Sequence, residues 1–181
     1  MEVVKTKLEG CIIIKPKVFG DARGIFLETF QKERYKNLAD IDLDFVQDNR
    51  SSSVKNVLRG LHYQKQKPQG KLVSVTQGSV FDVAVDLRPN SPTFGQYESV
   101  ILSAENNLQF YIPPGFAHGF LVLSESVDFQ YKCTDYYDPD DESGIAWNDS
   151  DINIDWPIKA PILSDKDMNQ PTFLSYKNNI K

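Results

Sequence analysis

The sequence predicts an all-β protein built as a jelly roll, with a few short helices beside the sheets. Composition is the first indication, because the 181 residues include 11 Phe and 8 Tyr, and Val and Ile recur in short runs; aromatic and β-branched side chains favour strands. The second indication is spacing, since short apolar segments alternate with Gly, Pro, Asn and Ser in turn-like clusters. The third is a strand-like alternation in residues 79–87, which collects these apolar side chains on one face: Phe81, Val83, Val85 and Leu87.

The same signals predict the individual elements in order from the N-terminus. Residues 11–14 form a first strand, and a turn with two glycines at 19–24 leads into a second strand at 25–30. Residues 31–39 form the only convincing helix, with charged side chains along one side. Further strands are predicted at 71–77, 79–87, 97–102, 108–112, 119–123 and 127–133. The segment from Asp138 onward is rich in Asp, Pro and Trp, and it predicts ordered loops with little regular structure.

Length, charge and terminal composition bound the class of protein. One domain spanning residues 1–181 is the simplest organisation, and it is long enough to bury a core. A net charge of −5 argues against a general nucleic-acid surface, although a pocket with a few cations could bind a small anion. No apolar run could span a bilayer and no signal peptide is apparent, so we expect no membrane partner and a cytoplasmic location. Cys11 and Cys133 are too far apart for a disulfide framework and are expected to be buried thiols.

The segment 59–64 contains His62, one of only two histidines in the chain. Histidine titrates near neutral pH, so it is the first candidate for proton transfer, although a satisfied structural histidine is an equally ordinary interpretation. The strand period places Gly60, His62 and Gln64 on one face and Arg59 on the other. For Arg59 and His62 to serve one site, the strand must bulge or end between them, and Gly60 would allow this.

The second histidine, His118, follows the rigid turn Pro113-Pro114-Gly115 in a Pro-x-Gly-x-x-His pattern. This pattern resembles the second motif of the cupin superfamily, whose small barrels often hold a metal ion. The first cupin motif needs His-x-His, whereas this chain has His62-Tyr63-Gln64. With two histidines, the usual three-histidine metal site cannot be assembled, so we expect no metal ligands.

Three other positions could serve metal-free proton chemistry, which needs a base, an orienting carboxylate, a cation and an opposed acid. Lys71 opens a predicted strand, where a solvated lysine is an equally simple interpretation. Tyr131 shares a strand face with Phe129, and a packed core tyrosine is the simpler interpretation. The run Asp165-Lys166-Asp167 is typical of a charged surface cluster.

Taken together, these segments resemble the dTDP-4-dehydrorhamnose 3,5-epimerase family along nearly the whole chain. The resemblance is strongest in the segments at 45–49, 58–64, 70–73, 78–88 and 113–120, and it extends from Gly20 to Asp167. It implies a cupin-type jelly roll (a double-stranded β-helix barrel), a homodimer, and no metal or other cofactor. Asn56 stands where the family usually has glycine, and asparagine is a residue that tolerates the left-handed conformation.

The resemblance also implies roles for four catalytic residues. The substrate would be dTDP-4-dehydro-6-deoxy-D-glucose, in which C3 and C5 are both α to the C4 ketone. His62 would remove their protons, and Asp167 would orient its imidazole. Lys71 would stabilise the charge that develops on O4, and Tyr131 would return a proton from the opposite face.

The resemblance also implies a set of residues that bind the nucleotide. Arg23 and Arg59 are the natural diphosphate partners, and Arg23 could come from the partner chain of a dimer. Phe26 and Tyr137 are candidates for packing on the thymine or deoxyribose, and Tyr137 is the preferred stacking partner. The full set of expected substrate-binding residues is Arg23, Phe26, Glu28, Gln47, Asp48, Asn49, Arg59, Lys71, His118, Tyr137, Glu142 and Lys166.

Three alternatives remain open from the sequence. A related epimerase that inverts only C3 or only C5 would share the motif residues. A cupin that only binds a nucleotide sugar would not need an opposed acid and base. A metal-dependent cupin oxygenase or isomerase would need ligands that the chain lacks.

Overall fold

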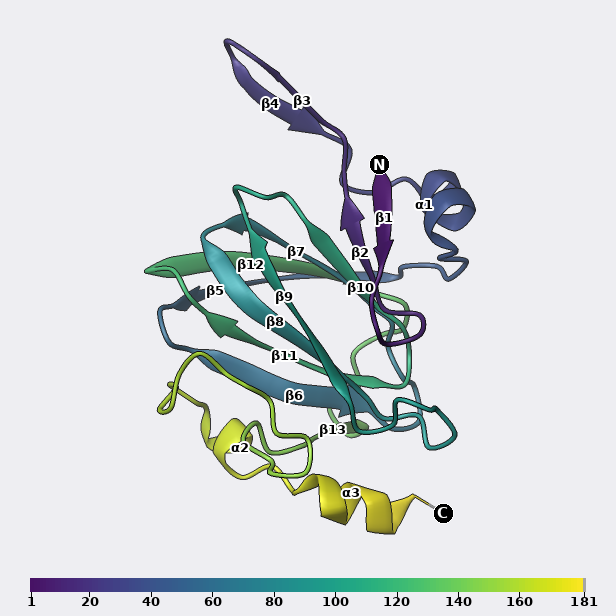
Figure 1. Cartoon of the computed structure of the whole chain (residues 1–181), viewed down its shortest axis with the longest axis vertical. Coiled ribbons are helices and arrows are strands. Elements are labelled where there is room, and N and C mark those ends of the chain that lie inside the picture. The colour runs from purple at the N-terminus through teal and green to yellow at the C-terminus, as the bar shows by residue number, and fades with distance from the viewer. Residues whose placement is uncertain (181) are drawn as a thin grey trace.

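Two antiparallel β-sheets face one another across a common core in the computed structural model, which describes residues 1–180 (Figure 1). The six-stranded sheet has the order β1-β2-β10-β7-β12-β5, and the five-stranded sheet has the order β13-β6-β11-β8-β9. Their strands are β1 (Glu2–Lys5), β2 (Ile12–Lys15), β5 (Gln47–Val54), β6 (Leu58–Gln64), β7 (Lys71–Gln77), β8 (Ser79–Asp86), β9 (Tyr97–Ser103), β10 (Gln109–Ile112), β11 (Phe116–Val122), β12 (Ser126–Cys133) and β13 (Glu142–Gly144). The interleaved strand order confirms the jelly roll predicted from the sequence.

The space between the sheets is filled at one end and open at the other. Buried apolar side chains from both sheets form the filled part, including Val73, Phe110, Phe120 and Phe129. Phe120 and Phe129 stack across the gap with ring centroids 4.1 Å apart. At the open end, the inward side chains of β5, β6 and β12 are polar and surround a cavity.

Additional segments cover the outer faces of the two sheets. Helix α1 (Lys32–Ala39) buries Tyr35 and Ala39 against the six-stranded sheet. The chain after β13 covers the five-stranded sheet and buries Trp156 and Phe173 there. As predicted, most of the chain from residue 138 to residue 180 is loop, and the regular elements after β13 are the short helices α2 (Asp165–Met168) and α3 (Phe173–Asn179). Helix α3 forms because Thr172 caps its first turn by accepting a hydrogen bond from the Ser175 N–H, and because Phe173 is buried.

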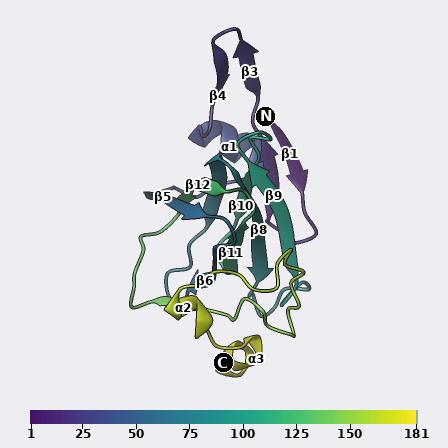
Figure 2. The same ribbon diagram turned by 90° about the vertical axis from the view of Figure 1, so that its left-hand side faces the viewer.

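A separate hairpin projects beyond the two sheets in both views (Figures 1 and 2). It consists of β3 (Val18–Asp21) and β4 (Gly24–Leu27), which pair with each other and with no other strand in the described part of the chain. Ile25 and Phe26 are 62% and 70% exposed at its end. Two large apolar side chains on a projecting hairpin are typical of an interaction surface.

No helix among residues 1–180 is both long and apolar enough to cross a membrane.

Candidate active site

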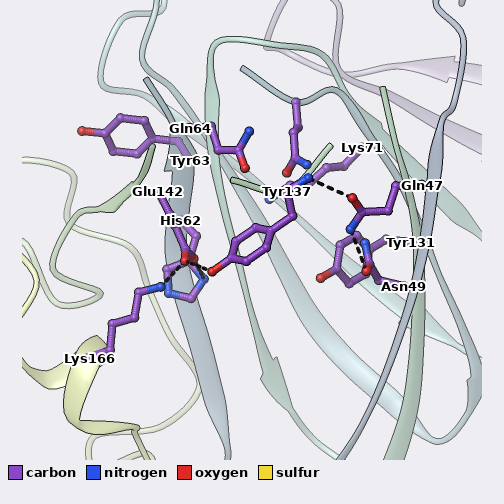
Figure 3. Close-up of a pocket in the computed structure, with 11 residues that line it drawn as sticks. Gln47, Asn49, His62, Tyr63, Gln64, Lys71, Tyr131, Tyr137, Glu142 and Lys166 are labelled. Atoms are coloured by element: carbon purple, nitrogen blue, oxygen red, sulfur yellow. Dashed lines mark hydrogen bonds and ion pairs between the residues drawn. The ribbon is translucent and has the colours of Figure 1, made fainter. Parts of the chain in front are cut away.

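The polar cavity at the open end of the barrel has a volume of about 360 Å³. Both sheets contribute to its walls, together with the loop after β12 and helix α2 (Figure 3). The lining residues are Gln47, Asn49, His62, Tyr63, Gln64, Gln69, Lys71, Tyr131, Tyr137, Glu142 and Lys166. Eight of these were predicted as site residues, whereas Tyr63, Gln64 and Gln69 were not.

Strand β6 presents Arg59 and His62 on the same side because its pairing with β11 is irregular between them. Arg59 lies opposite Phe120 and His62 lies opposite His118, so three steps along β6 correspond to two along β11. The extra residue reverses the alternation, and Gly60 accommodates it with φ at +124°. The bulge predicted at Gly60 is therefore present.

His62 is held by a carboxylate on the short helix α2. Its Nε2 atom lies 2.5 Å from Asp167 Oδ1, although 105 residues separate the two in the sequence. Burial by itself raises the pKa of Asp167, but hydrogen bonds from His62, Ser164 and the Gly60 N–H outweigh it and lower the pKa overall. An ionised Asp167 accepts the Nε2 proton, which leaves the Nδ1 lone pair of His62 free to act as a base.

Ser164 orients Asp167 and was not predicted as a site residue. Its hydroxyl donates to Asp167 Oδ2 at 2.8 Å and accepts from the Asp167 N–H at 3.1 Å. Ser164 thereby caps helix α2 and fixes the carboxylate in the same interaction. The spacing Ser-x-x-Asp is a helix-capping signal that could have identified it from the sequence.

Tyr131 and Lys71 lie on the wall opposite His62, because they belong to the adjacent strands β12 and β7 of the other sheet. Burial raises the pKa of Tyr131, which the nearby Arg59 partly opposes, so the phenol keeps its proton near neutral pH. Burial lowers the pKa of Lys71, and the charge of Glu142 is among the influences that oppose this shift. The Tyr131 phenol and the Lys71 amino group thus face the His62 imidazole across the cavity.

Glu142 connects the two sides of the cavity mouth. Its carboxylate forms an ion pair with Lys166, accepts the Tyr137 hydroxyl at 2.6 Å, and lies 3.9 Å from His62 Nδ1. The Tyr137 N–H donates to Gln47 Oε1 at 2.8 Å, and Figure 3 shows the Tyr137 ring crossing the cavity between His62 and Tyr131. Aromatic and hydrogen-bonding groups therefore surround the entrance.

Three predicted substrate-binding residues lie outside this cavity in the single chain. Arg23 and Phe26 are on the projecting hairpin, where Arg23 pairs with Asp21. Glu28 follows the hairpin and forms an ion pair of 2.7 Å with Arg34. The chain on its own does not bring these residues to His62.

Three further predicted residues border the cavity without lining it. Asp48 faces outward from β5 and pairs with Lys132 at 2.9 Å. His118 is buried, with Nε2 3.0 Å from the fully buried carboxylate of Asp82. Arg59 donates from Nε to Ser53 Oγ at 3.2 Å and is otherwise exposed.

This geometry suits proton abstraction next to a carbonyl group. The His62–Asp167 pair supplies an oriented base, and Tyr131 supplies an acid on the opposite wall. Lys71 supplies a cation for the charge that develops on an enolate oxygen.

Comparison with protein families agrees with this chemistry. The family model described as dTDP-4-dehydrorhamnose 3,5-epimerase matches residues 5–175. The chain belongs to this family.

Relatives and solved structures of the epimerase family cover almost the whole chain. A dTDP-4-dehydrorhamnose 3,5-epimerase from Shigella flexneri is 52% identical over 175 residues, which are 96% of this chain and 97% of that protein. A dTDP-6-deoxy-D-glucose-3,5-epimerase from Legionella pneumophila Philadelphia 1, solved in complex with dTDP-4-keto-L-rhamnose, is 54% identical with a TM-score of 0.93. The match covers 99% of this chain and 94% of that one, and it confirms the cupin-type fold.

The chain is also similar to an enzyme of narrower action. A 3'-monoepimerase from Streptomyces bikiniensis, solved in complex with dTDP-quinovose, is 33% identical with a TM-score of 0.89. That match covers 96% of this chain and 88% of the other.

Proposed function

We propose that this epimerase inverts C3 and C5 of dTDP-4-dehydro-6-deoxy-D-glucose and forms dTDP-4-dehydro-L-rhamnose. The observation that carries the proposal is the oriented base of His62 and Asp167 facing the protonated phenol of Tyr131 across one cavity. A base alone would exchange a proton on one face, whereas inversion needs an acid on the other face.

The reaction proceeds by the same steps at each carbon. His62 Nδ1 takes the proton from C3 or C5, and the electrons of the broken C–H bond move through the new C=C bond to O4. Lys71 stabilises the resulting enolate oxygen. The enolate then collapses to the ketone while Tyr131 gives its hydroxyl proton to the opposite face of the carbon. The phenolate and the imidazolium return to their starting states by proton exchange with solvent.

The nucleotide end of the substrate occupies the cavity mouth. Tyr137 offers a ring for stacking, and Gln47, Asn49 and Lys166 offer hydrogen bonds. Among residues 1–180, the Arg59 guanidinium is hydrogen-bonded only from Nε to Ser53, so its terminal nitrogens can pair with the diphosphate. His118 is proposed to act from the cavity floor, and Asp48 to act from the rim.

Replacement of the proposed base, His62, distinguishes catalysis from simple nucleotide-sugar binding. His62→Ala should bind dTDP with unchanged affinity by calorimetry but should lose turnover by on the order of a thousandfold. An equal loss of dTDP affinity and of turnover would show that His62 serves binding instead.

We also propose that the enzyme works as a homodimer whose hairpins complete the partner's sites. Ile25 and Phe26 are exposed on the projecting hairpin, and the nearby Arg23 does not reach the cavity of its own chain. A dimer would bury the apolar pair and bring the guanidinium to the diphosphate of the neighbouring site.

Mixing two inactive variants tests the exchange of Arg23. In a heterodimer of His62→Ala and Arg23→Ala chains, one site has both native residues only if Arg23 acts across the interface. Activity should therefore reappear after the two variants are unfolded together and refolded. Arg23 acts within its own chain if the mixture stays as inactive as its parents.

The proposed location is the cytoplasm. Both cysteines, Cys11 and Cys133, are free and buried, as in proteins of a reducing compartment. Fractionation of the producing cells tests this location.

The second candidate function is inversion at a single carbon. The similarity to a 3'-monoepimerase favours keeping it, because that enzyme shares this fold. The stereochemistry of the product, determined by NMR, separates the two activities.

A further inference from the structure

Gln64 is a buried glutamine whose amide group is fully engaged with the backbone of two loops. Its Nε2 donates to Lys67 O at 2.8 Å and to Tyr136 O at 3.2 Å. Its Oε1 accepts the Asp138 N–H at 2.8 Å. The side chain is 6% exposed and lies on the cavity side of β6, two residues after His62.

Two of these three bonds hold the residues on either side of Tyr137. The backbone of Tyr137 itself is held by Gln47 Oε1. The segment between β12 and β13 has no regular secondary structure at these positions, so side-chain bonds to its backbone determine its path. Held in this way, Tyr137 extends across the cavity to Glu142 (Figure 3).

The chemistry of the carboxamide explains why glutamine suits this position. One planar group supplies two N–H donors and one carbonyl acceptor, and the structure uses all three. A neutral histidine, which a metal-binding cupin would have here, supplies only one donor and one acceptor. Histidine could therefore not hold Lys67, Tyr136 and Asp138 together.

We propose that Gln64 is a positioning residue for nucleotide recognition, which clamps the segment 136–138 so that Tyr137 is placed over the cavity. This inference rests on the proposed function, because it assigns Tyr137 to the nucleotide. Gln64 acts only through Tyr137 and takes no part in the proton transfers of His62 and Tyr131.

The main test is Gln64→Met, which keeps the length of the side chain and removes all three hydrogen bonds. The Kd for dTDP and the KM for substrate should rise about tenfold, while kcat changes less than about twofold. Gln66→Met is the matched control, because Gln66 is exposed in the same loop and its side chain makes no hydrogen bond among residues 1–180. A Gln64→Met protein with wild-type Kd and KM would overturn the proposal.

A double-mutant cycle separates positioning of Tyr137 from a general structural role. Tyr137→Ala should weaken dTDP binding, and adding Gln64→Met to it should change the Kd no further. Losses that multiply in the double variant would show that Gln64 acts independently of Tyr137, which contradicts the clamp.

A second variant covers the case in which Gln64→Met does not fold. Gln64→Glu keeps the acceptor for the Asp138 N–H and loses the donors to Lys67 O and Tyr136 O, so its Kd should rise in the same direction. If neither variant folds while Tyr137→Ala does, the amide holds the barrel and the proposal is wrong. If the wild-type protein binds no dTDP, the proposed function fails first, whereas normal wild-type binding with unaffected variants removes only the clamp.

Discussion

At the scale of single residues, the two histidines occupy neighbouring positions but have different surroundings. His62 and His118 lie directly opposite each other in the β6–β11 ladder. His62 reaches the cavity and is held by Asp167, whereas His118 is buried beside Asp82 and burial lowers its pKa. Only His62 combines an orienting carboxylate with an open path to a substrate. Both histidines have a carboxylate partner, so access to the cavity explains the division of roles.

Tyr131→Phe separates proton abstraction from inversion at the residue scale. The variant keeps His62, Asp167 and Lys71 but has no hydroxyl proton to donate. Exchange of the substrate's α-protons with solvent should fall less than about tenfold, while product formation should fall on the order of a hundredfold or more. NMR in deuterated water measures both rates in one sample, and a parallel loss of the two rates would contradict the role of Tyr131 as the acid.

At the scale of elements, strand β6 depends on the bulge at Gly60. A Cβ atom at this position would lie 2.5 Å from Gly119 Cα and 2.8 Å from His118 O. Both contacts are with the backbone of the neighbouring strand, so the clash cannot be relieved by a side-chain movement. The bulge that turns Arg59 inward therefore requires a glycine.

Gly60→Ala should lower the free energy of unfolding by roughly 3 kcal/mol through this clash and the positive φ. Gly24→Ala is the matched control, because Gly24 has φ at +129° but nothing within 4 Å of its would-be Cβ. Urea unfolding followed by circular dichroism measures the free energy of unfolding of both variants. Equal destabilisation of the two variants would show that conformational strain alone, and not the approach of β11, makes glycine necessary.

Strands with an apolar period of two were predictable, and strands that line the cavity were not. The prediction of residues 71–77 matches β7 as observed, because Val73 and Val75 alternate into the core between the sheets, while Leu72 is buried on the other face under α1. Strand β5 (Gln47–Val54) was not predicted individually, since its cavity-facing side is polar. Strand β11 begins at Phe116, three residues before the prediction, because the whole strand is buried and shows no alternation.

At the scale of the whole molecule, the expected site residues came from the resemblance to the epimerase family, and the topology explains how they meet. Asp167 and His62 are distant in sequence, and only the path of the chain over the five-stranded sheet brings α2 to β6. Asn56 has φ at +67°, as predicted from its place at a glycine position. The clamp by Gln64 depends on a contact between residues 74 positions apart, which periodicity does not reveal, whereas the cap by Ser164 is local and has a sequence signal.

The stability of the whole fold in acid should depend on Asp86, which is fully buried. Burial raises its pKa, but hydrogen bonds from Arg88, Ser91 and Thr93 lower it from 3.8 to about 2. Because the folded pKa is the lower one, the ionised group stabilises the fold above about pH 4, and this contribution is lost as the pH falls toward 2.

Asp86→Asn removes this titrating group. The wild type should lose about 2 kcal/mol more stability than the variant between pH 4 and pH 2. Urea unfolding at several pH values measures the difference, with Asp140→Asn, at an exposed position, as the control. Parallel curves for wild type and Asp86→Asn would contradict the assigned role.

The central claim is that one base and one opposed acid invert both carbons next to the C4 ketone. The most direct measurement is incubation with dTDP-4-dehydro-6-deoxy-D-glucose in deuterated water, followed by NMR of the product. We predict deuterium at both C3 and C5, with dTDP-4-dehydro-L-rhamnose as the product and no label at either carbon when His62→Ala is used. Label at only one carbon would identify an epimerase of a single centre, and a wild-type reaction without label at either carbon would contradict the account.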